Sequence, residues 1–134
     1  MRRVHIVMGV LSLLLIAWSI WSCKDDVSSG GSCNIVFPDS NISYGKYVQP
    51  LFLCACAVPQ CHTSDFKAGG LSFETYAEAL ETPGVIWRGN PDASTLVKSI
   101  EGSIQPRMPI DLPPLTSNQI KGIRRWILEG AQDN

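Results

Sequence analysis

Apolar positions near the C-terminal end of the chain recur at the spacing of one helix face. Thr116-Ser117-Asn118-Gln119 precedes them and fits a capping box, in which the threonine and glutamine side chains satisfy free backbone amides of the first turn. Gly130 follows them and is a typical helix-ending residue. The sequence therefore predicts a helix between Thr116 and Gly130. The apolar stripe consists of Ile120, Ile123, Trp126 and Ile127.

Three earlier segments have weaker helical patterns. Tyr44 to Phe52 places aromatic and aliphatic side chains at helical spacing, with Pro50 as a kink or an interruption. Phe73 to Leu80 is a short candidate, and the segment from Pro91 to Ile100 is another, because proline suits a first helical turn. Long connections rich in proline and glycine separate these segments and need something to pack on. The expected fold class is therefore all-α, with Pro/Gly-rich loops.

The N-terminal segment has the pattern of an export signal. Arginines at positions 2 and 3 precede an apolar run from Val4 to Trp21. The run ends in Ile20-Trp21-Ser22-Cys23, which resembles the lipobox of bacterial lipoproteins and makes Cys23 the expected lipidation site. We therefore predict a signal peptide over residues 1–22. An uncleaved membrane helix is the alternative, because about 18 apolar residues approach the length that spans a bilayer.

Polar residues follow the lipobox and predict a lipid-anchored flexible tether over residues 23–41, ahead of a folded domain over residues 42–134. Lys24-Asp25-Asp26 is similar to the acidic signal that sends some lipoproteins of Bacteroidetes-like bacteria to the outer surface, although a plain solvated linker has the same composition. The expected location is extracytoplasmic and membrane-anchored, in the periplasm or on the outer surface of a Gram-negative bacterium.

Composition narrows the possible functions. A chain of 134 residues with 45% hydrophobic content is enough for one compact domain once a targeting segment is removed. A formal net charge of -1 offers no broad basic surface, so nucleic acid is excluded as a partner. The chain has 5 cysteines, an odd number, so they cannot all pair with one another as disulfides. At least one cysteine should therefore have another chemistry.

The clearest chemical motif is Cys56-Ala57-Val58-Pro59-Gln60-Cys61-His62. A c-type haem needs two thiols that add to its vinyl groups and a histidine directly after the second thiol to ligate the iron. The usual motif has two residues between the cysteines, whereas four residues separate Cys56 from Cys61. Because the porphyrin fixes the two vinyl positions, the extra residues must loop outward, with Pro59 shaping the loop.

Elimination points to the second iron ligand. Once the leader is removed, His62 is the only histidine and Met108 is the only methionine. Histidine and methionine are the ligand pair of low-spin electron-transfer haems, in which the thioether raises the reduction potential. Met108 also lies between two prolines, Pro106 and Pro109, on a loop with restricted freedom. The alternative is that Met108 only fills a gap in a core.

From about Ile42 to Asn134 the chain resembles the small cytochrome c domains of Planctomycetes- and Bacteroidetes-type bacteria, which have the fold of class I cytochromes c. The resemblance depends on the order and spacing of several short landmarks around the haem motif. These landmarks are Val48–Phe52, Ala68–Phe73, Gly89–Leu96, Arg107–Pro109, Leu115-Thr116 and Arg125–Ala131.

The resemblance implies one covalent haem c, attached through Cys56 and Cys61, with His62 and Met108 as metal ligands. The implied function is electron transfer, with the iron cycling between Fe(II) and Fe(III) and no substrate transformed, so the chain is not expected to be an enzyme. The implied partner is a redox partner protein or a membrane oxidoreductase.

The resemblance also assigns residues around the haem. Leu71 and Phe73 are expected to line an apolar pocket, and the Tyr44 and Ile120 helices to cross beside the haem edge. Arg107 is the expected partner of a haem propionate, because a guanidinium binds carboxylates in a forked pair. Trp87 and Arg88 are expected behind Arg107. The alternative places Trp87 in the core and Arg88 in solvent.

Two interpretations remain for Cys33 and Cys54. In an oxidising compartment they are expected to pair as a disulfide, or they stay free, with Cys54 as a further candidate for haem attachment. The rival function is an extracytoplasmic binding module without haem, stabilised by a disulfide or by zinc. Its zinc ligands would be Cys54, Cys56, Cys61 and His62.

Overall fold

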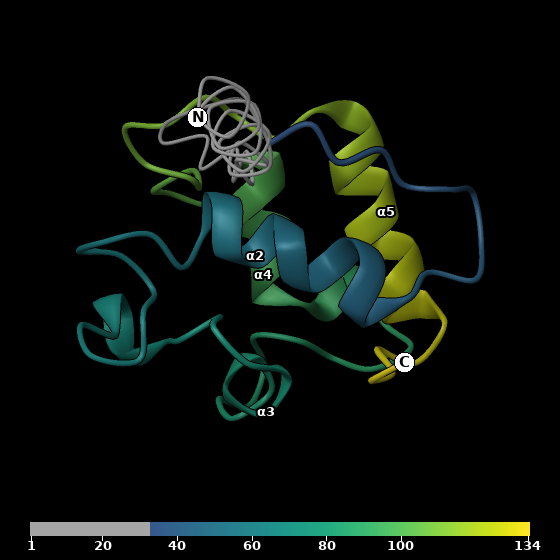
Figure 1. Ribbon diagram of the computed structural model, residues 1–134, viewed down its shortest axis with the longest axis horizontal. Helices are drawn as coiled ribbons and strands as arrows, with labels where there is room; N and C mark the ends of the chain where they lie inside the picture. The colour runs from purple at the N-terminus through teal and green to yellow at the C-terminus, as the bar shows by residue number, and fades with distance from the viewer. Residues whose placement is uncertain (1–32) are drawn as a thin grey trace, which may run out of the picture. The chain divides into compact units, whose positions relative to one another are not determined.

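The computed structural model describes residues 33–134, which contain helices and loops and no strand (Figure 1). The all-α prediction is confirmed for this part of the chain. The predicted signal peptide over residues 1–22, the lipidation site Cys23 and the first part of the predicted tether lie outside the described residues. Within residues 33–134, no helix is long and apolar enough to cross a membrane.

The first helical segment changes type at its proline. It begins as a π-helical turn, η1 (Tyr44–Val48), and continues as α2 (Gln49–Ala55). The N–H of Gln49 donates to the carbonyl of Tyr44, five residues earlier, so the wider turn ends directly before Pro50. Proline has no N–H and its ring collides with the preceding turn of a regular α-helix, which the wider turn relieves. The expected interruption at Pro50 is therefore a change of helix type.

The helix predicted from Phe73 begins later than its pattern indicates. α3 spans only Tyr76–Ala79, and the hydroxyl of Thr75 caps it by accepting a hydrogen bond from the N–H of Glu78. Phe73 lies ahead of the helix, where its N–H donates to the carbonyl of His62 at 2.9 Å. This hydrogen bond to the loop after α2 holds Phe73 out of the helix.

The segment after Pro91 is divided in two by a buried serine. A 3₁₀ turn, η3 (Pro91–Ala93), precedes α4 (Thr95–Glu101), and Ser94 between them is extended. The Ser94 hydroxyl is fully buried, where it accepts a hydrogen bond from the N–H of Trp87 and donates one to the carbonyl of Asn90. These two hydrogen bonds satisfy the buried hydroxyl of Ser94.

The C-terminal helix matches its prediction closely. α5 spans Ser117–Leu128, and its capping box is formed in both directions between Thr116 and Gln119. Gly130 ends it with φ +100°, a conformation that favours glycine. Three members of the predicted stripe are buried, namely Ile123, Trp126 and Ile127.

Aromatic rings join η1 and α2 to α5 in the core. The ring of Trp126 lies 5.5 Å from the ring of Tyr44 and 6.2 Å from that of Phe52, measured between centroids. The Phe52 ring in turn lies 4.9 Å from the ring of Phe73. The first and last helical segments therefore pack on each other, as the resemblance implies. The class I cytochrome c arrangement of the whole domain remains a prediction.

The segment 33–42, which we call the N-terminal strap, packs on α5. Phe37 is buried, its N–H donates to Oδ1 of Asn118 at 2.8 Å, and Nδ2 of Asn118 donates back to the Phe37 carbonyl at 3.0 Å. The Gln119 side chain donates to the carbonyl of Cys33. The predicted boundary at residue 42 is therefore wrong, because residues 33–41 belong to the folded domain and are not a flexible tether. The apolar side chain that decides this is Phe37.

Gly122 of α5 is the position on which the strap lies, and we expect Gly122→Ala to destabilise the domain. A Cβ atom at this position would lie 2.1 Å from the Phe37 ring, so the ring must move out of the core. Forced overpacking of this kind costs about 1–3 kcal/mol. Urea unfolding measures the loss. Gly45→Ala is the matched control, because its nearest neighbour would be the Asn134 carbonyl oxygen at an ordinary 3.7 Å. Equal stability of the two variants would contradict this packing.

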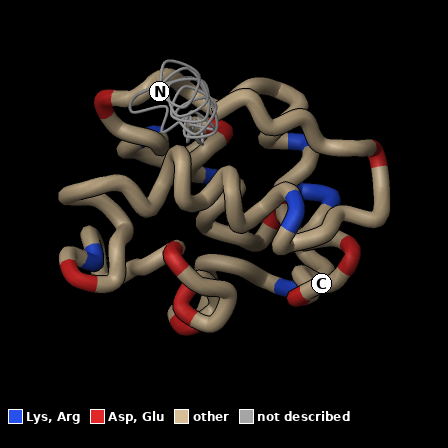
Figure 2. Tube along the Cα trace, viewed as in Figure 1, with Lys and Arg blue, Asp and Glu red and all other residues tan. Residues whose placement is uncertain are grey.

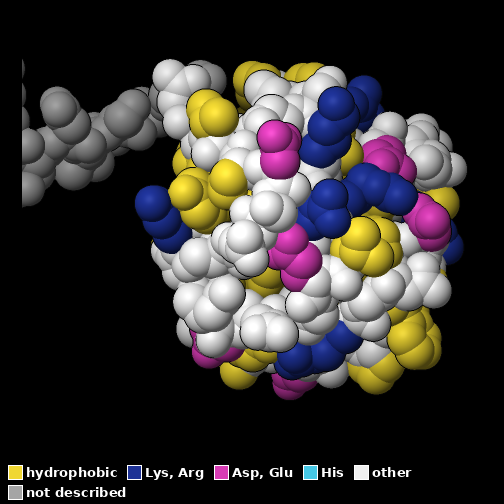
Figure 3. All heavy atoms as spheres, turned by 90° about the vertical axis from the view of Figure 1, so that its right-hand side faces the viewer, with side chains coloured by type: hydrophobic (Ala, Val, Ile, Leu, Met, Phe, Trp, Pro, Cys, Tyr) yellow, Lys and Arg dark blue, Asp and Glu magenta, His cyan; other side chains and the backbone are white. Residues whose placement is uncertain are grey.

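Charged residues of the described part are interspersed by sign. Figure 2 shows Lys and Arg positions and Asp and Glu positions spread over the trace, and on the face in Figure 3 basic side chains lie beside acidic ones. Arg124 pairs with Asp92 and with Glu101, and Arg125 lies 3.9 Å from Glu129. Such exposed pairs contribute little to stability.

Candidate functional site

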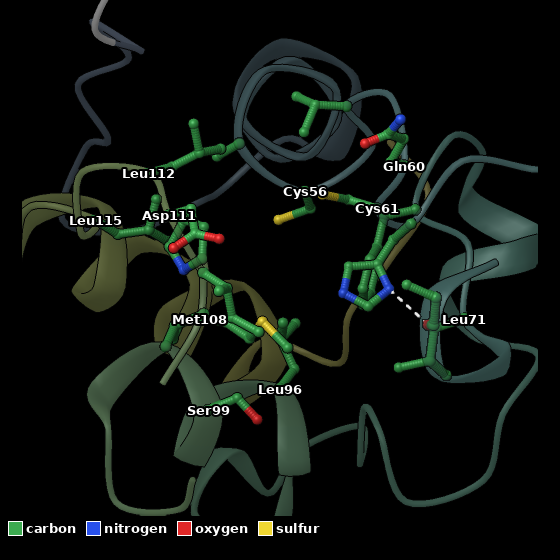
Figure 4. A pocket seen from close by; sticks show the side chains of 18 of the residues that line it. Cys56, Gln60, Cys61, Leu71, Leu96, Ser99, Met108, Asp111, Leu112 and Leu115 are labelled. Carbon is green, nitrogen blue, oxygen red and sulfur yellow. Dashed lines mark hydrogen bonds between the residues drawn. The ribbon is translucent and has the colours of Figure 1, made fainter. Parts of the chain in front are cut away.

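A cavity of about 480 Å³ opens between the end of α2, the loop that follows it, α4 and the loop before α5. Its size is within the range of about 300–1,000 Å³ that small-molecule and cofactor sites have. Six of the seven residues predicted to bind the cofactor line it. They are Cys56, Cys61, His62, Leu71, Phe73 and Met108. Figure 4 shows Leu71 and Met108 on opposite sides of the cavity, with Cys56 and Cys61 above them.

The four residues between the two cysteines form a turn. The N–H of Cys61 donates to the carbonyl of Val58 at 3.0 Å, which closes the turn over the exposed residues Pro59 and Gln60. The N–H of His62 donates to the carbonyl of Cys56 at 3.1 Å. This second hydrogen bond draws the two ends of the widened motif together, so both cysteines line one cavity despite their unusual separation in the sequence.

His62 has a fixed orientation for its ring. Its Nδ1 lies 3.0 Å from the carbonyl oxygen of Ala68, the hydrogen bond drawn as a dashed line in Figure 4. A carbonyl only accepts, so Nδ1 carries the proton and Nε2 is left with a lone pair for a metal ion. The ring also contacts Phe73 edge to face, with centroids 5.3 Å apart. Such backbone support is typical of a histidine that ligates a metal.

Met108 lines the cavity from the loop between α4 and α5. Its N–H donates to the carbonyl of Ser99 at 3.0 Å, which ties this loop to the last turn of α4. The side chain is half-buried and packs against the core. The thioether therefore borders the same cavity as the imidazole of His62, from an element far from it in the sequence.

The cysteines of the described residues fall into two classes. Cys33 and Cys54 form a disulfide with a Cα–Cα distance of 6.0 Å, whereas Cys56 and Cys61 are free. Burial, with a smaller contribution from the nearby Cys61, raises the pKa of the Cys56 thiol to about 12. The paired interpretation of Cys33 and Cys54 is therefore correct, and the two free thiols are the two that border the cavity.

Arg107 is the predicted site residue that does not line the cavity. Its side chain is exposed, and its Cδ would lie 3.0 Å from a Cβ atom placed on Gly102. Trp87 and Arg88 are also absent from the cavity lining. Trp87 is 54% exposed, so its placement in the core is wrong, and Arg88 contacts Tyr76 and the Gly130 carbonyl.

Comparison with known proteins adds one finding. A family model described as Planctomycete cytochrome C matches residues 59–110. The match supports a cytochrome c-like domain in this part of the chain, and it includes Cys61, His62 and Met108. Cys56 lies just outside the matched range, so its place in the site depends on the structure. No curated protein and no solved structure matches the chain.

The donor set of the cavity fits one covalently attached haem. Two free thiols, one imidazole with an available nitrogen and one thioether border a single cavity whose other walls are mainly apolar. Pattern analysis missed most of those apolar walls. They include Ala55, Val85, Leu96, Ile100 and Leu115. The helical spacing of Leu96 and Ile100 is visible in the sequence, but whether a buried residue borders a cavity or another side chain depends on how distant elements pack.

The same donors do not fit a zinc module. Cys54 was one of the four candidate zinc ligands, and its sulfur is bonded to Cys33. Within residues 33–134, no group of three or more His, Cys, Asp and Glu residues is arranged to hold a metal ion. A structural zinc ion requires four ligands in close tetrahedral geometry. The disulfide part of the rival interpretation is present in the structure, and it is compatible with either function.

Proposed function

We propose that this chain is an electron-transfer protein with one covalently bound haem c. The observation that carries the proposal is the single cavity that brings together the free thiols of Cys56 and Cys61 with His62 and Met108. The matched family model supports the same function through its cytochrome c description. The arrangement around the haem would be that of a class I cytochrome c.

Each of the four residues has a distinct role in this proposal. The thiols of Cys56 and Cys61 would attach the cofactor as thioethers, in which each sulfur bonds to a vinyl carbon and the thiol hydrogen goes to the other carbon. Nε2 of His62 and the sulfur of Met108 would hold the iron. The hydrogen bond from His62 to Ala68 keeps the imidazole in one tautomer and one orientation.

Haem supplies an iron that accepts and releases one electron between its Fe(III) and Fe(II) states. Most of the remaining walls of the cavity, such as Leu71, Leu96 and Leu115, are apolar and would limit the access of water to a bound haem. A dry site disfavours the more highly charged Fe(III) form, and a thioether ligand acts in the same direction. The chain itself transforms no substrate, and its partner is a redox protein or a membrane oxidoreductase.

The proposed location follows from the N-terminal sequence. Covalent haem attachment to bacterial cytochromes takes place outside the cytoplasm, and the export signal over residues 1–22 with lipidation at Cys23 would deliver the domain there. The proposed protein is a membrane-anchored lipoprotein of the periplasm or of the outer surface. Acyl chains on Cys23 would keep it close to a membrane oxidoreductase.

The test is a pyridine haemochrome spectrum of the full chain expressed together with a cytochrome c maturation system. We expect a c-type spectrum that persists after extraction with acidified acetone, because thioether bonds do not break under that treatment. Cys61→Ser leaves one thioether and should shift the haemochrome band toward that of a singly attached haem. Ser103→Ala is the matched control, because Ser103 is exposed and does not border the cavity.

Two results would decide against the proposal. The first is wild-type protein that carries no haem while another cytochrome c matures normally in the same cells. The second is haem that acidified acetone removes completely from the wild type. In the first case the module without haem, stabilised by the Cys33–Cys54 disulfide, becomes the better interpretation, and in the second case the chain binds haem without thioether bonds.

A further inference from the structure

The cysteines of the folded domain are crowded in the sequence but separated by role in the structure. Cys54, Cys56 and Cys61 lie within eight residues, and only Cys54 is in a disulfide, with the distant Cys33. Four cysteines allow three complete pairings. A domain that uses two of its thiols for another purpose must prevent the pairings that consume them.

Local chain statistics favour the wrong partner for Cys54. Its disulfide to Cys33 spans a sequence separation of 21, whereas Cys61 is only seven residues away. Loop-closure entropy depends on the logarithm of loop length with a factor of three halves, so the shorter loop closes about fivefold more readily. An unstructured chain in an oxidising compartment would therefore join Cys54 to Cys61 more often than to Cys33.

The fold reverses this preference through the N-terminal strap. The Gln119 side chain donates to the Cys33 carbonyl, and Phe37 fixes the strap through its buried ring and the two hydrogen bonds between its backbone and Asn118. Together these contacts place Cys33 at the side of α2. Cys54 lies within α2 and Cys56 directly after it, and positions two apart on a helix face different directions. Cys54 is thus turned to the strap while Cys56 borders the cavity.

We infer that the Cys33–Cys54 disulfide sorts the cysteines of this domain, keeping Cys54 from pairing with Cys61 or Cys56 so that both cavity thiols remain free for haem attachment. The inference rests on the proposed function. Formation of the bond releases two protons and two electrons, which a disulfide oxidant of the exported compartment accepts as it becomes a dithiol. Cys33 and Cys54 act as positioning residues, since neither borders the cavity.

The test compares Cys33→Ser with Cys54→Ser and with the double variant, because all three lack the disulfide to the same extent. Only Cys33→Ser leaves Cys54 unpaired beside the two cavity thiols. The full chains are exported without haem maturation, alkylated without reduction and cut with trypsin. Cleavage after Lys24, Lys46 and Lys67 gives one peptide, 25–46, with Cys33 and a second peptide, 47–67, with the three other cysteines.

Alkyl groups on the 47–67 peptide give the first readout. The wild-type peptide should be linked to 25–46 and carry two alkyl groups. In Cys33→Ser we expect one alkyl group and an internal disulfide, whereas in Cys54→Ser and in the double variant we expect two. Three alkyl groups on the Cys33→Ser peptide would overturn the inference, because they would show that Cys54 forms no disulfide with Cys56 or Cys61 when Cys33 is absent.

Haem content after maturation gives the second readout. Cys33→Ser should lose most of its covalent haem relative to the double variant, because a chain in which Cys54 has paired with Cys61 or Cys56 lacks two free cavity thiols. Equal loss of covalent haem in Cys33→Ser and in the double variant would overturn the inference. The loss would then come from the lower stability of a domain without the disulfide. Failure of the proposed function is a separate result: the wild type then carries no haem, while the alkylation patterns still report whether Cys54 mispairs.

Discussion

Replacement of Met108 by leucine is expected to lower the midpoint potential of the haem-bearing protein on the order of 0.2 V, within the range of about 0.8 V that axial ligands control. The thioether stabilises the reduced iron, and leucine cannot replace it as a ligand. Leucine has nearly the volume of methionine, so the packing around the half-buried side chain is kept. A redox titration measures the potential, and the weak far-red band of thioether ligation to Fe(III) should disappear.

Neighbouring residues of the same loop provide controls for this prediction. Arg107→Ala removes an exposed side chain that does not border the cavity, and Ile104→Ala removes a side chain that is 37% exposed. Both variants should keep the far-red band. A Met108→Leu variant that also keeps the band and the wild-type potential would show that Met108 only fills a gap in the core.

Local signals were sufficient to predict the C-terminal helix. The capping box of Thr116 and Gln119 and the stripe that contains Trp126 depend on residues within one helix, and α5 has both features. The motif from Cys56 to His62 also identified three residues that line the cavity. In each case the deciding interactions join positions that are close in the sequence, so their pattern can be recognised without the fold.

Contacts between distant positions could not be predicted in this way. Phe37 appeared to belong to a polar tether, and it is buried because Asn118 and Gly122, more than 80 residues later, provide its hydrogen bonds and the space for its ring. The boundary at residue 42 was wrong for this reason. Trp87 shows the opposite error, because a large apolar residue was expected in the core and lies 54% exposed.

The disulfide was one of several possibilities that the sequence left open. Nothing in the spacing of Cys33 and Cys54 distinguishes a bridge from two free thiols, and loop closure favours nearer partners. The strap decides the pairing by contacts with α5, which only the folded domain provides. Because Cys54 is bonded to Cys33, Cys56 and Cys61 are the two thiols that remain for the cavity.

Replacement of Trp126 by alanine is expected to lower the free energy of unfolding by about 3–5 kcal/mol, which is comparable to the whole stability of a small domain. The side chain is 1% exposed and contacts the rings of Tyr44 and Phe52, which belong to η1 and α2. Its Nε1–H donates to the carbonyl of Gln132 at 2.9 Å, so truncation also leaves that carbonyl without its partner. Denaturant unfolding followed by far-ultraviolet circular dichroism measures the loss.

Trp87→Ala is the matched control for Trp126→Ala, because it removes the same side chain from a position that is 54% exposed. We expect it to change the free energy of unfolding by less than about 1 kcal/mol, as surface substitutions usually do. Equal losses in the two variants would mean that the contacts among Trp126, Tyr44 and Phe52 do not hold the first and last helical segments together. The covalent haem would then be the main link between them. A large difference, measured in protein without haem as well, would assign that role to the aromatic core and explain how the cavity keeps its shape before the cofactor is attached.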